Sequence, residues 1–132
     1  MPHGNHSLIC GKIIAMKSIV YTVCFVLFTA FMYNSVYEKG QASYYSSKFE
    51  GRKTASGEIF RQDSLTAAHR SLPFGTKVKV TNLKNDSTVI LKINDRLGKS
   101  SSRCIDVSLR AAKQLNFVRA GITNVTIEKL TK

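Results

Sequence analysis

The chain has 132 residues, with 20 Lys and Arg against 8 Asp and Glu and an ordinary apolar content of 43%. From Gly40 onward, 17 basic and 7 acidic residues leave a net charge of +10, which favours an anionic partner: nucleic acid, acidic lipid headgroups or the carboxylate- and phosphate-bearing polymers of a bacterial wall. The three cysteines follow no metal-ligand spacing and only Cys104 lies beyond Gly40, which excludes a disulfide framework in the mature protein. We predict no metal and no cofactor.

An almost unbroken apolar run extends from Ile19 to Met32, just after Lys12 and Lys17. As a helix with about 1.5 Å rise per residue it spans roughly 21 Å, which is short of the ~30 Å hydrocarbon layer. The run therefore fits the hydrophobic region of an export signal better than a transmembrane helix. Met16 directly before Lys17 is a typical signal start, so translation from Met16 is an alternative to translation from Met1.

The segment 29–35 holds no clear small-x-small cleavage site, so an uncleaved membrane anchor is the second interpretation of the apolar run. Lipidation at Cys24 is not expected, because Val23 precedes it where a small residue is needed. We therefore predict a signal peptide or anchor over 1–35, a linker over 36–39 and one folded domain over 40–132.

From Gly40 the sequence changes to short alternating stretches between turn residues, which is typical of β structure. We expect strands over 41–45, 76–82, 87–94 and 124–130, a short apolar segment over 65–69, and a loop over 49–58. A turn over 84–86 makes the two central strands a hairpin, with the inward side chains Val78, Val80, Val89, Leu91 and Ile93.

Ser108 is predicted to cap one short helix over 109–115. Cys104, just before Ile105, is interpreted as a small buried hydrophobe, with a reactive thiol as the alternative. About six strands with one small helix and no βαβ alternation indicate an all-β fold, a closed or nearly closed barrel.

Four residues that could carry chemistry lie at strand ends or in loops beside small residues: Glu58, His69, Asp95 and Asp106. Each also has a purely structural interpretation. Glu58 could be a solvated loop charge and His69 a hydrogen-bonded core histidine. Asp95 could cap a turn or pair with Arg96, and Asp106 could accept backbone N–H groups at the helix entry.

The segments around these residues form one ordered pattern: Gly40-Gln-Ala-Ser-Tyr-Tyr, Gly51-Arg-Lys-Thr-Ala-Ser-Gly-Glu58, Leu65-Thr-Ala-Ala-His69-Arg, Leu72-Pro-Phe-Gly-Thr-Lys-Val-Lys-Val-Thr-Asn82, Ile93-Asn-Asp-Arg96, Ile105-Asp-Val-Ser108 and Arg119-Ala-Gly121. The pattern resembles the rare lipoprotein A (RlpA)-like double-psi β-barrel family over nearly all of 40–130. The resemblance implies a six-stranded double-psi β-barrel and lytic transglycosylase activity on peptidoglycan strands.

The family's functional positions fall on Glu58, His69 and Asp95, and Asp106 matches the Asp that serves in related barrels such as expansins and MltA-type transglycosylases. The chain departs from the family at Leu97-Gly98, where members often have Gly-Pro, and it has no tryptophan. The family's lipidation cysteine and C-terminal SPOR domain are also not found, which affects the expectation of septal targeting more than that of catalysis.

The activity implied by the resemblance needs one carboxyl that protonates the glycosidic oxygen and then accepts the proton of the muramic C6 hydroxyl as a 1,6-anhydro ring closes. We predict Asp95 for this role, held protonated by partial burial and by Glu58 or Asp106, with His69 orienting it or sharing its proton. Candidate substrate-binding residues are Arg52, Lys53, Arg70 and Arg96 for acidic groups, and Tyr44 and Tyr45 for sugar faces.

The expected partner is therefore the peptidoglycan glycan strand, with division or envelope proteins as further candidates, at the bacterial cell envelope. The domain would work in the periplasm, either free or anchored to the inner membrane. A non-catalytic wall-binding module of the expansin type is the second interpretation. Nucleic-acid binding rests on charge alone, lacks interleaved aromatic residues and is disfavoured by the export segment.

Overall fold

The computed structural model describes residues 17–24 and 37–130, which fall in two compact units, Met1–Asn34 and Ser35–Lys132. In the first unit, residues 17–24 are helical, and the Thr22 hydroxyl donates a 2.8 Å hydrogen bond to the Ser18 carbonyl. The apolar side chains of this helix are exposed. Neither described segment contains a helix with both the length and the apolar character needed to span a bilayer. The segment 25–35, Met16 and the predicted cleavage region lie outside the described residues.

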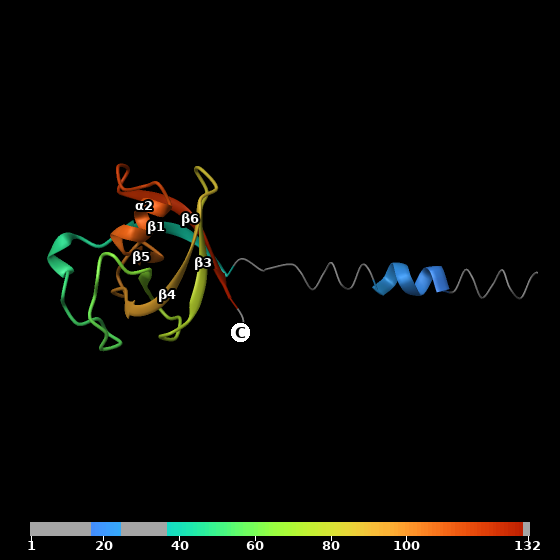
Figure 1. Cartoon of the computed structure of the whole chain (residues 1–132), viewed down its shortest axis with the longest axis horizontal. Helices are drawn as coiled ribbons and strands as arrows, with labels where there is room; N and C mark the ends of the chain where they lie inside the picture. Colours follow the sequence, from blue (N-terminus) through green and yellow to red (C-terminus); the bar gives the residue numbers. More distant parts are fainter. Residues whose placement is uncertain (1–16, 25–36, 131–132) are drawn as a thin grey trace, which may run out of the picture. The chain divides into compact units, whose positions relative to one another are not determined.

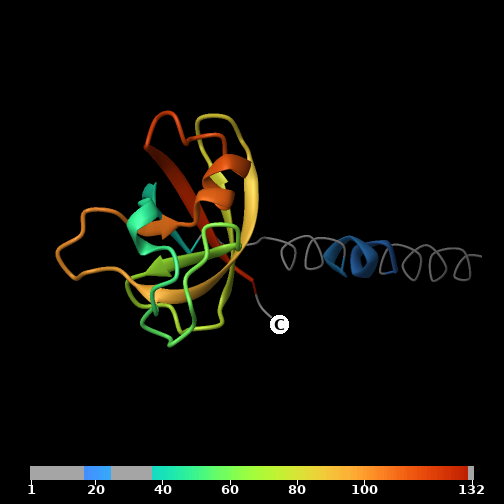
Figure 2. The same cartoon turned by 60° about the vertical axis from the view of Figure 1, so that its left-hand side comes forward.

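The second unit is a closed barrel in which the strands follow the order β1-β5-β2-β4-β3-β6. Figures 1 and 2 show this unit from two directions. The pairs β1–β5 and β2–β4 are parallel and the other pairs are antiparallel. The strands are β1 (Glu38–Tyr44), β2 (Thr66–His69), β3 (Lys77–Asn82), β4 (Thr88–Arg96), β5 (Ile105–Val107) and β6 (Ile122–Lys129), with the 3-10 helix η1 (Ser47–Phe49) and the helix α2 (Leu109–Gln114). The expectation of an all-β, six-stranded barrel with one short helix is confirmed.

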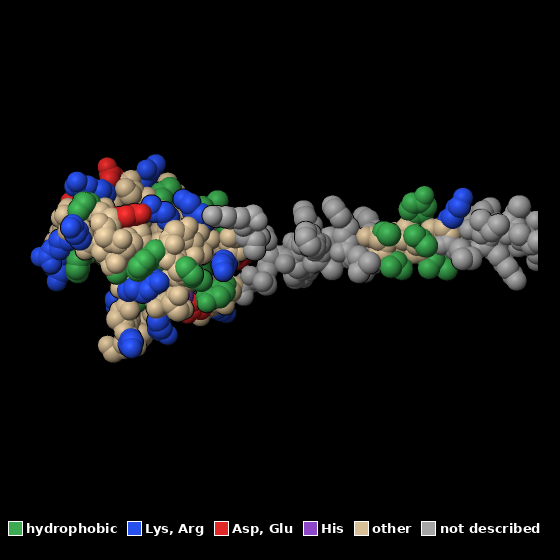
Figure 3. Space-filling view, turned by 90° about the horizontal axis from the view of Figure 1, so that it is seen from below, with side chains coloured by type: hydrophobic (Ala, Val, Ile, Leu, Met, Phe, Trp, Pro, Cys, Tyr) green, Lys and Arg blue, Asp and Glu red, His purple; other side chains and the backbone are tan. Residues whose placement is uncertain are grey.

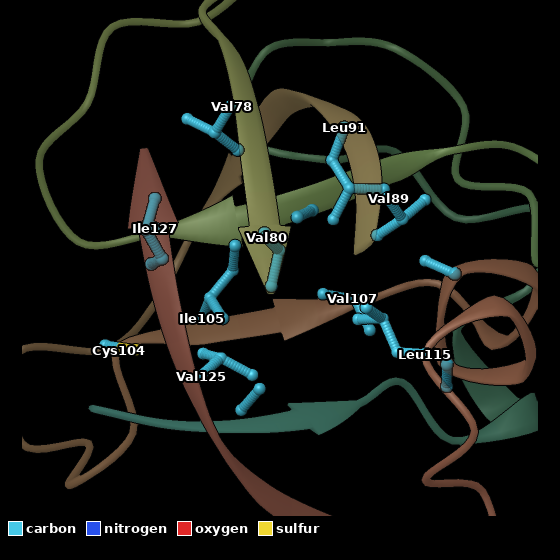
Figure 4. Close-up of a cluster of buried hydrophobic side chains, with 14 of the residues drawn as sticks. Val78, Val80, Val89, Leu91, Cys104, Ile105, Val107, Leu115, Val125 and Ile127 are labelled. Carbon is cyan, nitrogen blue, oxygen red and sulfur yellow. The ribbon is translucent and has the colours of Figure 1, made fainter. Parts of the chain in front are cut away.

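The barrel interior is filled by the alternate side chains that the sequence pattern selects. Val78 and Val80 of β3 are fully buried, and their cross-strand partners Leu91 and Val89 of β4 lie in the same core (Figure 4). Ile93 of β4 is also fully buried. The other four strands, the helix α2 and the residue after it supply most of the remaining core side chains. These include Ala42, Ala67, Ile105, Val107, Ala112, Leu115, Val125 and Ile127. The predicted inward faces of both hairpin strands are thus confirmed.

Two features of the barrel differ from the prediction. β1 begins at Glu38 rather than Gln41, because Glu38 and Lys39 continue the antiparallel pairing with β6 into the segment predicted as a linker. β5 was not predicted as a strand, because three residues are too few for an alternating pattern. Asp106 consequently lies within a strand and not at the helix entry, where the Ser108 hydroxyl instead accepts the Ala111 N–H at 3.3 Å.

Cys104 is a buried residue, 5% exposed, and its Sγ lies 3.3 Å from the Gln41 carbonyl oxygen. Burial raises the pKa of the Cys104 thiol to about 11. The interpretation of Cys104 as a small buried side chain is confirmed.

We expect iodoacetamide at pH 7.5 to label Cys24, which is exposed, well before Cys104 in the folded chain. Only a small fraction of a thiol with a pKa of about 11 is ionised at that pH, and the fraction rises as the pH approaches 11. Peptide mapping by mass spectrometry after timed quenching measures both sites at once. Equal labelling rates of the two cysteines in the folded chain, without urea, would contradict the buried placement.

The side chain of Asn82, the last residue of β3, is buried and makes three hydrogen bonds. Its Nδ2 donates to the Leu115 carbonyl at 2.8 Å, and its Oδ1 accepts from the Thr123 hydroxyl at 2.8 Å and from the Lys84 N–H at 3.0 Å. Asn82→Ala should lower the free energy of unfolding by about 2–4 kcal/mol, because buried polar groups lose their partners. Urea unfolding measures this, and Thr81→Ala on the outward face of the same strand should cost less than about 1 kcal/mol.

Candidate active site

A row of outward-facing residues crosses the centre of the barrel wall. The pairing register aligns Ser43 of β1 with Asp106 of β5, Asp106 with Ala68 of β2, and Ala68 with Asp95 of β4. Neighbouring strands lie about 4.8 Å apart, so the backbones at Asp106 and Asp95 are roughly 10 Å apart. Ala68 between them is buried, so the row places the two carboxylates on either side of a covered alanine.

The outward direction of Asp95 depends on a register shift in β4. Ala67 pairs with Ile93, whereas the next residue of β2, Ala68, pairs with Asp95, so Asn94 is an extra residue on β4. Such a bulge restarts the alternation of side chains. Ile93 therefore stays in the core while Asp95 faces outward with Ala68.

The Asp95 carboxylate is held by three donors. Its Oδ1 accepts the N–H groups of Ala55 and of Arg96, each at 2.9 Å, and its Oδ2 accepts the hydroxyl of Tyr45 at 2.6 Å. Neither Glu58 nor Asp106 is hydrogen-bonded to Asp95 among the described residues. The side chain hydrogen-bonded to Asp95 is instead that of Tyr45.

Tyr45 lies directly after β1 and is held by its ring and by its backbone. The ring packs on Phe60 with 4.3 Å between centroids and edge-on to Phe49 at 5.6 Å. Burial, and secondarily the hydrogen bond to Asp95, raise the pKa of the Tyr45 phenol far above its ordinary value of 10. The phenol is consequently a hydrogen-bond donor to Asp95.

Asp106 belongs to a separate ion pair on the same row. Arg103 holds the carboxylate with both Nε, at 2.8 Å, and Nη2, at 3.2 Å, and the Ser43 hydroxyl donates to Oδ1. The hydrogen bond to Asp106 raises the pKa of Arg103. Asp106 is thus an anion neutralised by a forked partner.

Glu58 is presented by a tight turn in which Gly57, at a φ of +89°, donates its N–H to the Thr54 carbonyl. Its carboxylate accepts hydrogen bonds from Lys92 Nζ at 2.9 Å and from Asn94 Nδ2 at 3.2 Å. These bonds, that of Lys92 first, hold the pKa of Glu58 below its ordinary value. Glu58 and Asp95 both fix the same loop onto β4, because Asp95 accepts from Ala55 and Glu58 accepts from Lys92 and Asn94.

His69 is buried, with 1% exposed, at the end of β2. Its Nδ1 accepts the N–H groups of Ser71 at 3.1 Å and Leu72 at 3.0 Å, so the ring proton is on Nε2, which lies 2.6 Å from Glu38 Oε2. Every polar atom of the ring therefore has a partner other than Asp95. The structure gives His69 the role of a hydrogen-bonded core histidine, and it does not bring His69 and Asp95 together.

The predicted substrate-binding residues are divided between the site and its surroundings. Arg96 lies beside Asp95, with its guanidinium carbon 4.0 Å from the centroid of the half-exposed Phe74 ring. Arg70 instead donates to the carbonyls of Ser101 and Arg103. Arg52 and Lys53 are exposed on the loop before Glu58. Tyr44 donates its hydroxyl to the Val118 carbonyl at 2.9 Å and packs edge-on to Phe117, so it supports the core.

Several residues of the site were not singled out from the sequence. Asn94 is buried, and its Oδ1, like Thr66 Oγ1, has no hydrogen-bond partner among the described residues. Asn94 lies within the Ile93–Arg96 motif, which was the available signal for it. No local sequence pattern identifies Lys92, Arg103 or Ser43 as a site residue. Each takes part in the site only by binding a carboxylate on another strand or turn.

The charge around the site is positive. Lys and Arg side chains are spread over the face of the barrel seen in Figure 3, with few Asp and Glu side chains between them. In the described part of the chain, no three His, Cys, Asp and Glu side chains are placed to hold a metal ion. The site thus consists of the half-buried Asp95 and Asp106 and the exposed Glu58, with Lys92, Arg96 and Arg103 beside them.

The closed barrel, with this carboxylate row on its outer wall, defines a double-psi β-barrel protein. The model of the family described as "Lytic transglycolase" matches residues 37–127, and the chain belongs to this RlpA-like family. The resemblance inferred from the sequence motifs is confirmed.

Two curated relatives support this assignment. The chain is 46% identical over 118 residues to the "Probable endolytic peptidoglycan transglycosylase RlpA" of Treponema pallidum, covering 89% of this chain and 36% of the relative. It is 48% identical over 96 residues to the "Endolytic peptidoglycan transglycosylase RlpA" of Haemophilus influenzae, covering 73% and 33%. The chain thus spans about a third of the length of these relatives.

Among solved structures, the expansin of Clavibacter michiganensis matches with a TM-score of 0.57 and 23% identity, over 71% of this chain and 50% of that one. At this identity the likeness concerns the fold alone.

We expect His69→Ala to lower the free energy of unfolding by about 2–4 kcal/mol, because the two backbone N–H groups on Nδ1 would lose their acceptor inside the protein. His69→Asn should recover part of the loss, since its Oδ1 can accept near the position of Nδ1. Urea unfolding followed by far-UV circular dichroism measures both variants. Wild-type stability of His69→Ala would contradict the structural role.

Proposed function

We propose that this chain is an endolytic peptidoglycan lytic transglycosylase that cleaves MurNAc-GlcNAc glycosidic bonds and forms 1,6-anhydro-MurNAc. The observation that carries the proposal is the position of Asp95, a half-buried carboxylate fixed by three donors on the outward row, in a member of the lytic transglycolase family. A rigid carboxyl on an open barrel wall can reach a bond in the middle of a long polymer, as endolytic cleavage requires.

In the proposed reaction, protonated Asp95 gives its proton to the glycosidic oxygen as the bond between that oxygen and muramic C1 breaks. The C6 hydroxyl oxygen of the same sugar then bonds to C1, and its proton passes to the Asp95 carboxylate. The proton returned equals the proton donated, so the enzyme is regenerated and no water is consumed. One carboxyl is sufficient for both steps.

The neighbouring residues would act on the substrate by charge and shape. Arg96 on Phe74 offers a cation beside Asp95 for an acidic substituent of the glycan. Glu58 and Asp106, each paired with a cation, would serve as fixed anions that position Lys92, Asn94 and Arg103. His69 would act through the fold of the turn that follows β2.

The place of action follows from the substrate. The apolar run from Ile19, which begins within the exposed helix 17–24, would act as an export signal and carry the domain to the cell envelope. We infer that the barrel works in the periplasm, free or tethered by this segment, with peptidoglycan strands as its partner. Division or envelope proteins are further candidate partners.

Asp95→Asn is expected to abolish the release of 1,6-anhydro-muropeptides from purified sacculi, because an amide can neither donate nor recover the proton. The measurement is mass spectrometry of the soluble products. The amide keeps the shape of the carboxylate, so circular dichroism should show an unchanged fold.

Asp106→Asn is the matched control, since it removes the second carboxylate of the row without touching the contacts of Asp95. Loss of product in Asp106→Asn alone would transfer the acid–base role to Asp106, and unchanged yield in Asp95→Asn would overturn the assignment. Binding of the wild-type chain to sacculi with no soluble product would favour the non-catalytic, expansin-like alternative.

A further inference from the structure

We propose that Tyr45 is a positioning residue that selects Oδ2 of Asp95 as the oxygen that exchanges the proton with the glycan. The inference rests on the proposed transglycosylase function and adds to it a residue and a reacting atom. It follows from how the donors are distributed over the two carboxylate oxygens.

A carboxylate oxygen has two acceptor positions. Oδ1 of Asp95 receives two backbone N–H groups, from Ala55 and Arg96, so both of its positions are occupied. Oδ2 receives only the Tyr45 hydroxyl, at 2.6 Å, and keeps one position. A proton on the Asp95 carboxyl can therefore be carried on Oδ2 without breaking either backbone hydrogen bond.

The Tyr45 hydroxyl is fixed by contacts on all sides of the residue. The backbone N–H of Tyr45 donates to the Val107 carbonyl at 3.0 Å, and its carbonyl accepts from Gln62 Nε2 at 2.9 Å. The ring packs on Phe60, which is itself 2% exposed. The hydroxyl thus has little freedom to leave Oδ2, and a preorganised donor costs no reorganisation during the reaction.

The same phenol stays a donor over the whole working range of pH. Burial first, and the hydrogen bond to Asp95 next, raise the pKa of Tyr45 well above its ordinary value. Tyr45 therefore does not itself exchange the proton with the substrate. Its effect is exerted on Asp95, through one hydrogen bond.

The hydrogen bond matters most when Oδ2 loses its proton. As Oδ2–H protonates the glycosidic oxygen, the C1–O bond breaks and negative charge develops on Oδ2, where the Tyr45 hydroxyl stabilises it. When the C6 oxygen bonds to C1, the C6 hydroxyl proton returns to Oδ2. Tyr45 lowers the energy of the intermediate stage and holds the oxygen that must receive the proton.

Tyr45→Phe in the full chain tests the proposal, because it keeps the ring against Phe60 and removes only the hydroxyl. We expect the kcat for release of 1,6-anhydro products to fall roughly 10- to 100-fold with little change in KM or in binding to sacculi. The alkaline side of the pH–rate profile should move to higher pH, since the ionised carboxylate loses a hydrogen-bond donor in the variant. A purely structural role would lower the thermal midpoint without moving this profile.

Ser43→Ala is the matched variant, because Ser43 gives Asp106 the same kind of hydroxyl hydrogen bond that Tyr45 gives Asp95. We expect it to have a smaller effect on kcat and no effect on the pH profile. If Asp95→Asn abolishes product release while Tyr45→Phe keeps the wild-type kcat and profile, the Tyr45 proposal is overturned and the proposed function stands. If the wild-type chain releases no anhydro product, the proposed function itself fails.

Discussion

The burial of β2 between β4 and β5 is the constraint on which the site depends. All four residues of this short strand are buried, and it pairs in parallel with β4 and antiparallel with β5. Backbone pairing holds each neighbouring strand about 4.8 Å from β2. On the inner face of the strand, Ala67 packs in the core. On the outer face, Ala68 lies between Asp95 and Asp106. The packing that closes the barrel therefore also sets the distance between the two carboxylates.

The two carboxylates of the row are treated differently by their surroundings, although the sequence presents them alike. The carboxylate of Asp106 forms an ion pair with Arg103, whereas that of Asp95 accepts hydrogen bonds from backbone N–H groups and a phenol, which carry no net charge. Neutral donors fix the geometry of Asp95 and leave it free to change its protonation state without separating an ion pair. This contrast, rather than proximity of the two acids, distinguishes the proposed acid–base residue from a structural anion.

Most of the fold could be predicted because it rests on local patterns. Alternation identified the faces of β3 and β4, and the Ser108 cap identified α2. The motif segments named Glu58, His69, Asp95 and Asp106, but not their mutual arrangement. That arrangement depends on long-range facts that no local pattern carries: the three-residue β5, the ring of Tyr45 reaching across from β1, and the pairing of His69 with Glu38. His69 was placed beside Asp95 by analogy, whereas the strand register points it elsewhere.

The bulge at Asn94 makes the number of residues in β4 as important as their identity. If Asn94 paired regularly and formed no bulge, strict alternation after Ile93 would turn the side chain of Asp95 toward the apolar interior, where an unpaired carboxylate is strongly disfavoured. Insertion of one further residue here would exchange the inner and outer faces for the remainder of the strand. The number of residues in the motif Ile93–Arg96 therefore determines which face each following side chain takes. We expect the barrel to accommodate substitutions in this motif more readily than changes in its length.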